Sequence, residues 1–151
     1  MSTTSTTVTT VRRSTDAPRD RREVLHANNE RALRPAYQIL MFGYIVLPVV
    51  AGVDKFFHFL VDWNKYLAPQ VVSRLPLSPR DFMHAVGVIE IAAGLLVALK
   101  PSVGGVVVAL WLWGIIANLL IAHGWYDVAL RDFGLSLGAL ALSRLAGGMG
   151  R

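Results

Sequence analysis

Long apolar segments separated by short polar ones are the feature that most limits what this chain can fold into. Residues 36–53 hold a single strongly polar side chain, Gln38, in eighteen positions. Apolar character resumes after Asp54 and Lys55, and three further apolar segments follow. A helix needs about 20 such residues to cross the hydrocarbon core of a bilayer. We therefore predict four membrane-spanning helices, at residues 36–61, 82–99, 103–122 and 126–146.

Charged residues are concentrated at the N-terminal end of the chain. Residues 1–34 contain seven Arg and four acidic residues, whereas the remaining 117 residues carry only fourteen charged side chains. So few charges over that length argue against a soluble enzyme and favour a chain surrounded mostly by lipid. Although the net charge is +5, the basic residues lie beside apolar segments, which indicates membrane topology rather than nucleic-acid binding.

The sequence divides into two parts, residues 1–34 and residues 35–151. The first part is predicted to be a polar cytoplasmic segment, with a disordered tail at residues 1–15 followed by a helix that Asp16 caps and Pro35 stops or bends. The second part is the transmembrane domain. The chain has no cysteine, which excludes disulfides, covalently attached c-type haem and Cys-ligated iron–sulfur clusters.

Short connections at residues 100–102 and 123–125 predict antiparallel neighbours, and hence an all-α, transmembrane four-helix bundle. With a cytoplasmic N-terminus, ten basic residues fall on the inner side and four on the outer side. The positive-inside rule therefore predicts that both termini are cytoplasmic.

In this orientation the charged side chains and histidines within the spans lie toward the outer half of the membrane, whereas the inner halves, at residues 36–53, 91–99, 103–117 and 133–143, contain no charged side chain. Charge at membrane depth costs roughly 2.5–3.5 kcal/mol per residue, so we expect these side chains to face the bundle interior and pair. The spacing of Asp127 and Arg131 supports such pairing, as does that of Asp54 and His58. The predicted network consists of Asp54, Lys55, His58, His84, Glu90, Asn118, His123, Arg131 and Asp132.

Two interpretations of this network remain open. It either fixes helix packing only, or lines a pocket for a quinone or lipid head group, a metal ion or a haem. Histidines on three helices, His58, His84 and His123, are the candidate metal ligands, but they lack the spacing of a ligand pair such as HxxxH. For a quinone, Glu90, Asp54, His84 and the Trp111/Trp113 pair would supply hydrogen bonds beside an apolar slot. A quinone thus fits the pattern better than a metal or haem, and no catalytic residue is identified.

Glycines mark the surfaces where helices are expected to approach closely. Gly87 and Gly94 flank Glu90 on its own face and would let a neighbouring helix reach its carboxylate. The same role is predicted for a further set on the last two spans, namely Gly104, Gly105, Gly114, Gly134 and Gly138.

Three stretches of the sequence resemble the DoxX-like family of small four-helix bacterial membrane proteins. They are LPVVAGVDKFFHFLVDWNKYLAP, HAVGVIEIAAGLLV and WYDVALRDFGLSLGALALSRLA, and the resemblance covers residues 36–146. Members of that family belong to, or are encoded with, thiosulfate:quinone oxidoreductases, and others are associated with redox-stress membrane complexes. The resemblance carries no settled catalytic residue, and the absence of cysteine argues against direct sulfur transfer.

The resemblance implies a multi-pass protein of the bacterial cytoplasmic (inner) membrane. Its expected role is an accessory subunit of a redox or respiratory-type assembly rather than an independent enzyme, with a polar ligand pocket in the outer half of the bundle. Its expected partners are membrane lipids and either other membrane subunits or further copies of itself. The alternative is a structural or scaffold membrane protein whose buried charges only fix helix packing.

Overall fold

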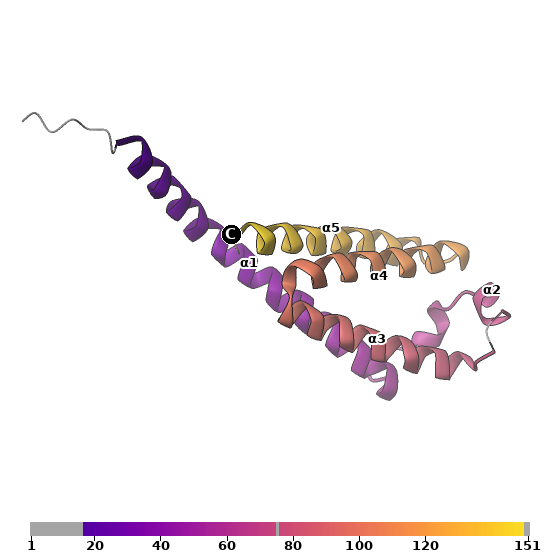
Figure 1. Cartoon of the computed structure of the whole chain (residues 1–151). Helices are drawn as coiled ribbons and strands as arrows, with labels where there is room; N and C mark the ends of the chain where they lie inside the picture. Colours follow the sequence, from indigo (N-terminus) through magenta and orange to yellow (C-terminus); the bar gives the residue numbers. More distant parts are fainter. Residues whose placement is uncertain (1–16, 75, 150–151) are drawn as a thin grey trace, which may run out of the picture.

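A computed structural model describes residues 17–74 and 76–149, and these residues are helical apart from short connections (Figure 1). The four long helices are α1 (Ala17–Phe57), α3 (Pro79–Leu99), α4 (Pro101–Ile121) and α5 (Tyr126–Met149). Between α1 and α3 lie two single turns, η1 (Trp63–Tyr66) and α2 (Pro69–Val72). The all-α prediction is confirmed for the described residues.

Helix α1 differs from its prediction at both Pro35 and its end. It continues through Pro35 and Pro48 over 41 residues, so the expected stop or bend at Pro35 does not divide it into two helices. A proline removes one backbone hydrogen bond, whereas unwinding the helix in lipid would expose several. The helix ends at Phe57, not at residue 61, because His58 adopts a left-handed φ of 57°. The predicted cap Asp16 and tail 1–15 lie outside the described residues.

The other long helices lie close to their predicted ranges. Helix α3 begins three residues before the predicted 82, at Pro79, because the Ser78 side chain accepts a hydrogen bond from the backbone N–H of Asp81. Helix α4 likewise begins with a proline, Pro101, directly after the end of α3. A proline in the first turn lacks only an N–H that would have no partner within the helix.

The long helices pack as two antiparallel pairs. Helix α1 packs along α3 and α4 along α5, and the two pairs converge near the α3–α4 connection and diverge toward the opposite end (Figure 1). The buried core lies where they converge and includes Tyr44, Val97, Val108, Ala139 and Leu142. The Tyr44 hydroxyl donates a hydrogen bond to the carbonyl of Leu135, which ties α1 to α5 across this crossing.

Three segments are long and apolar enough to cross a membrane, namely Arg31–Phe57, Pro79–Leu99 and Pro101–Ile121. Helix α5 is not among them, because its sequence contains four charged residues: Asp127, Arg131, Asp132 and Arg144. Large apolar side chains remain exposed on the outside of the pairs, as lipid-facing residues do in membrane proteins. Examples are Ile39, Phe42, Leu110 and Leu130. These helices indicate a membrane protein.

Glycines bring the backbones of α1 and α3 into direct contact. A Cβ at Gly52 would lie 2.6 Å from the carbonyl oxygen of Gly87, and one at Gly94 would lie 2.9 Å from that of Ile45. The predicted close approach beside Glu90 is therefore confirmed.

The glycines of α4 and α5 divide into two groups. A Cβ would collide with neighbouring atoms at Gly104, Gly105 and Gly138, which therefore make the predicted contacts. At Gly114 and Gly134 a Cβ would meet nothing within 4 Å. The prediction of close packing is wrong at these two positions, because they lie on faces that the partner helix does not cover.

Candidate functional site

A buried ion pair joins α1 to α3. The Nζ atom of Lys55 lies 2.5 Å from Oε2 of Glu90, and the two side chains are only 4% and 8% exposed. Lys55 lies in the last turn of α1, and Glu90 is reached across the close glycine contact at Gly87. Two opposite charges this close neutralise each other where water is excluded.

Asp54, the neighbour of Lys55, caps the chain that follows α1. One carboxylate oxygen accepts hydrogen bonds from the backbone N–H groups of Phe59 and Leu60, at 2.8 and 2.9 Å. The other oxygen accepts a hydrogen bond from the indole Nε1–H of Trp63 at 2.7 Å. The Asp54 carboxylate therefore accepts hydrogen bonds from the residues that follow α1 and makes none with the Lys55 ammonium.

Trp63 joins the cap to the ion pair. Its ring centroid lies 3.7 Å from Nζ of Lys55, which is the geometry of a cation–π contact. Asp54, Lys55, Trp63 and Glu90 thus form one connected set, which we call the Lys55–Glu90 cluster. The network predicted from the sequence contains Asp54, Lys55 and Glu90 but not Trp63.

Asn118 makes a second tie, between α4 and the segment that joins α1 to α3. Its amide Nδ2 donates to the carbonyl of Tyr66 at 2.8 Å, and its Oδ1 accepts from the N–H of Ala68 at 3.1 Å. Tyr66 also packs edge-on against Trp125, at 4.7 Å between ring centroids. These contacts hold residues 63–68 across the end where the two helix pairs diverge.

The three candidate histidines occupy different local environments. His58 directly follows the end of α1, and His123 lies two residues beyond the end of α4. Both have positive φ values, of 57° and 53° respectively. His84 is half-buried on α3 and stacks on Phe56, with 4.9 Å between ring centroids. Among the described residues, no three His, Asp or Glu side chains are grouped to hold a metal ion. The structure therefore offers no support for the candidate metal site of His58, His84 and His123.

The charged residues of α5 divide between surface and interior. Arg131 pairs with Asp127 at 2.7 Å, but both side chains are largely exposed, at 71% and 67%. Arg131 is thus paired on the surface and not drawn into the Lys55–Glu90 cluster. Asp132 is half-buried and lies within electrostatic reach of Glu90 and Lys55.

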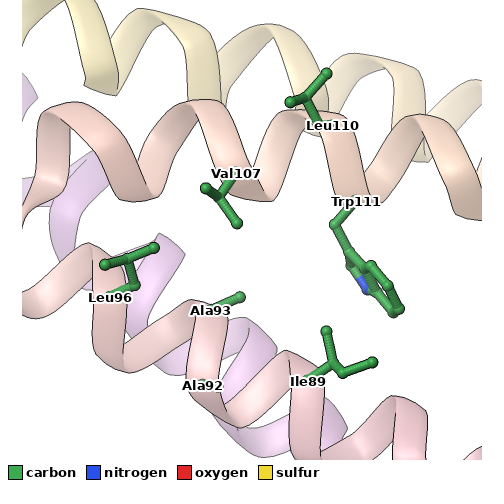
Figure 2. Close-up of a pocket in the computed structure, with 7 residues that line it drawn as sticks. All are labelled: Ile89, Ala92, Ala93, Leu96, Val107, Leu110 and Trp111. Carbon is green, nitrogen blue, oxygen red and sulfur yellow. The ribbon is translucent and has the colours of Figure 1, made fainter.

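An apolar groove of about 460 Å³ lies between α3 and α4, where the pairs diverge (Figure 2). Its walls are aliphatic except for the indole of Trp111. The slot expected from the sequence has Trp111 and Trp113 beside Glu90, Asp54 and His84, whereas none of these three polar residues lines the groove. Trp113 instead donates to the hydroxyl of Ser136 on α5, at 3.2 Å.

These observations define the class of molecule: an α-helical membrane protein with a buried interhelical ion pair and an apolar groove between its helix pairs. Comparison of the chain with protein-family models, curated proteins and solved structures gives no match. The likeness to the DoxX-like family therefore stays an expectation from the sequence.

Proposed function

We propose that this chain is a four-pass scaffold subunit of a bacterial cytoplasmic membrane, in which the Lys55–Glu90 cluster fixes helix packing. The observation that carries the proposal is that Asp54, the Lys55–Glu90 pair and Asn118 all bond to the chain itself. Lys55 pairs with Glu90, Asp54 accepts three hydrogen bonds, and Asn118 makes two. A pocket for a polar head group at this position would have to displace these bonds.

Helix α5 provides the fourth crossing in this proposal. Its 24 residues span about 36 Å at 1.5 Å per residue, and it packs along α4. Asp127 and Arg131 lie in its first two turns and Arg144 lies near its end, where charged side chains can reach the lipid head groups. Four crossings and the seven Arg within residues 1–34 favour cytoplasmic positions for both termini.

Membership of a redox or respiratory-type assembly is the more specific part of the proposal. The resemblance of residues 36–146 to the DoxX-like family supports it. The exposed apolar faces of the helices offer surface for lipids, for other membrane subunits or for further copies of this chain. In such an assembly the chain would act through helix contacts, with its internal ion pair keeping α1 and α3 in register.

Neutralising the buried ion pair one residue at a time, and then together, tests the scaffold role. We expect Glu90→Leu and Lys55→Met each to lower the free energy of unfolding by about 3–5 kcal/mol, because each leaves one buried charge unpaired. The double variant should recover most of this loss, since two apolar side chains pack without any charge. The measurement is reversible unfolding of the full chain in detergent micelles.

The exposed pair provides the matched control. Asp127→Asn and Arg131→Gln break an ion pair of similar length at the surface, and we expect no measurable change in stability. The scaffold role would be wrong if Glu90→Leu left the stability unchanged. It would also be wrong if the stable double variant no longer entered the membrane assemblies that contain the wild-type chain, because the charges would then serve more than packing.

A further inference from the structure

The groove between α3 and α4 is lined by apolar side chains. It has a volume of about 460 Å³. Ile89, Ala93 and Leu96 of α3 face Val107 and Trp111 of α4 across it (Figure 2). The indole nitrogen of Trp111 is buried in the protein and lies out of reach of a molecule in the groove. The part of an occupant that lies in the groove must therefore be hydrocarbon.

The groove extends through only half of the thickness of a membrane. Ile89 and Trp111, at its deep end, each lie eleven residues from Lys100, which joins α3 to α4. At 1.5 Å per residue this is about 16 Å, or roughly half of a hydrocarbon core of about 30 Å. A membrane-spanning helix of another subunit would need a surface that continues through both leaflets, whereas the acyl chain of a phospholipid fills only one. The length of the groove therefore favours an acyl chain.

The groove is closed beside the α3–α4 connection and open toward the bilayer. Beside the connection the two helices touch, since a Cβ at Gly104 would lie 2.5 Å from the Cα of Val97. Farther along the rim, Leu110 is 68% exposed and Ile89 is 45% exposed. An acyl chain can thus enter the groove sideways from the surrounding lipid.

The end of the molecule nearest the groove is basic. Lys100 is exposed, and residues 91–126 contain no other Asp, Glu, Lys or Arg. The two ion pairs among the described residues lie elsewhere, so neither provides Lys100 with a carboxylate. Arg144 lies at the same end, next to Ser143, whose hydroxyl donates a hydrogen bond to the carbonyl of Ser102 at 2.5 Å. These positive charges complement a phospholipid head group with a net negative charge.

We propose that the groove and Lys100 together bind an anionic phospholipid of the phosphatidylglycerol type. One acyl chain lies in the groove, and the phosphate lies beside the Lys100 ammonium, since a lysine stem can follow apolar surface while its charge reaches the head groups. This binding role goes beyond the scaffold role and requires only that α3 and α4 cross the membrane. It does not depend on the Lys55–Glu90 cluster, so either proposal can fail while the other holds.

Photo-cross-linking of the full chain in phosphatidylcholine nanodiscs tests this site. The probe is a trace of phosphatidylglycerol with a diazirine in the middle of one acyl chain, and mass spectrometry identifies the labelled residues. We expect labels within residues 89–96 and 107–111 that added phosphatidylglycerol reduces and an equal amount of phosphatidylethanolamine does not. Labels spread over the lipid-facing residues of all the long helices, or equal competition by the two lipids, would overturn the proposal without any substitution having been made.

Matched charge variants test the contact with the phosphate. Lys100→Gln should raise the half-competing concentration of phosphatidylglycerol about fivefold, because a lysine at the membrane surface attracts anionic lipid. The Lys100 side chain makes no cap hydrogen bond, so the variant should fold normally. Arg74→Gln removes one positive charge from an exposed position between α1 and α3 and should leave the concentration unchanged. Equal competition in Lys100→Gln and the wild type would overturn the assignment of Lys100 to the phosphate.

Matched phenylalanine variants test whether the acyl chain occupies the groove. Ala92→Phe extends a ring into the groove from its exposed rim and should abolish competed labelling, with an unchanged melting profile showing that the variant folds. Leu95→Phe, exposed on the same helix but outside the groove, should leave the labelling unchanged. Competed labelling that survives in Ala92→Phe would overturn the proposal. So would a wild-type dimer that Ala92→Phe dissociates, since the groove would then belong to a second copy.

Discussion

Asp54 shows how a single carboxylate can end a membrane helix. Its three accepted hydrogen bonds replace the helical partners that Phe59 and Leu60 lack beyond the end of α1, and they fix Trp63 over Lys55. Hydrogen bonds to charged groups contribute about 1.5–3 kcal/mol each, and bonds that share one carboxylate are not additive. Substituting Asp54 therefore tests how much these hydrogen bonds contribute to the stability of the fold.

We expect Asp54→Ala to lower the free energy of unfolding by about 3 kcal/mol, because two backbone donors and an indole lose their acceptor together. Asp62→Ala is the control: its carboxylate caps η1 at an exposed position, and its loss should cost about 1 kcal/mol. Chemical unfolding in micelles measures both. Equal losses for the two variants would mean that Asp54 contributes no more than an ordinary surface cap.

His58 and His123 lead to a second prediction at this scale. Both adopt left-handed backbone conformations, which cost a non-glycine residue about 1–2 kcal/mol. His58→Gly and His123→Gly should therefore leave stability unchanged or raise it by up to about 1 kcal/mol. His84→Gly, inside α3, should instead lower it by about 1 kcal/mol or more. Thermal melting distinguishes these outcomes, and a loss of stability at His58 or His123 would show that the imidazoles make a contribution of their own.

Among the helices, the contact between α1 and α3 depends on glycine. Gly52→Ala would place a Cβ 2.6 Å from the Gly87 carbonyl, so we expect it to lower stability by about 1–3 kcal/mol by forcing the helices apart. Gly114→Ala, with open space around it, should have no effect or stabilise α4 by up to about 1 kcal/mol. Unfolding of the two variants side by side is the measurement. A neutral Gly52→Ala would show that the two helices can separate freely.

Hydropathy and spacing predicted the helices well, because a segment of about 20 apolar residues has few other ways to satisfy its backbone in lipid. The starts of α3 and α4 also follow from local chemistry, since Ser78, Pro79 and Pro101 favour a helix start. Hydropathy does not specify which face of a helix packs against which neighbouring helix. Gly105 and Gly114 look alike in the sequence, yet only Gly105 touches the partner helix.

The candidate site was predicted only in part, because hydropathy identifies charges that must be buried but not the tertiary contacts around them. Burial of charge in an apolar segment identified Lys55 and Glu90, and their pairing follows from the cost of leaving either alone. Trp63 and the groove at Trp111 were not anticipated in their observed places. They depend on how residues 58–68 turn back over α1 and on how far α3 and α4 diverge, and both are tertiary properties.

For the whole molecule, the proposed topology can be tested by labelling, because the chain has no cysteine of its own. Single cysteines at Asn28 and Lys100 should react with a membrane-impermeant maleimide only after the cells are permeabilised. Cysteines at Ser73 and Gly124 should react from outside intact cells. All four positions are exposed in the structure. Reaction of Gly124→Cys and Lys100→Cys from the same side would mean that α4 does not cross the membrane.

The ion pair between α1 and α3 also has a consequence for biosynthesis. Lys55 is translated 35 residues before Glu90, which at about 5–20 residues per second is a delay of roughly 2–7 seconds. Throughout that interval the ammonium group lacks its Glu90 partner, so release of α1 alone into lipid is unfavourable. We therefore expect the insertion machinery to retain α1 until α3 emerges from the ribosome, so that the two helices leave the translocon together as a hairpin.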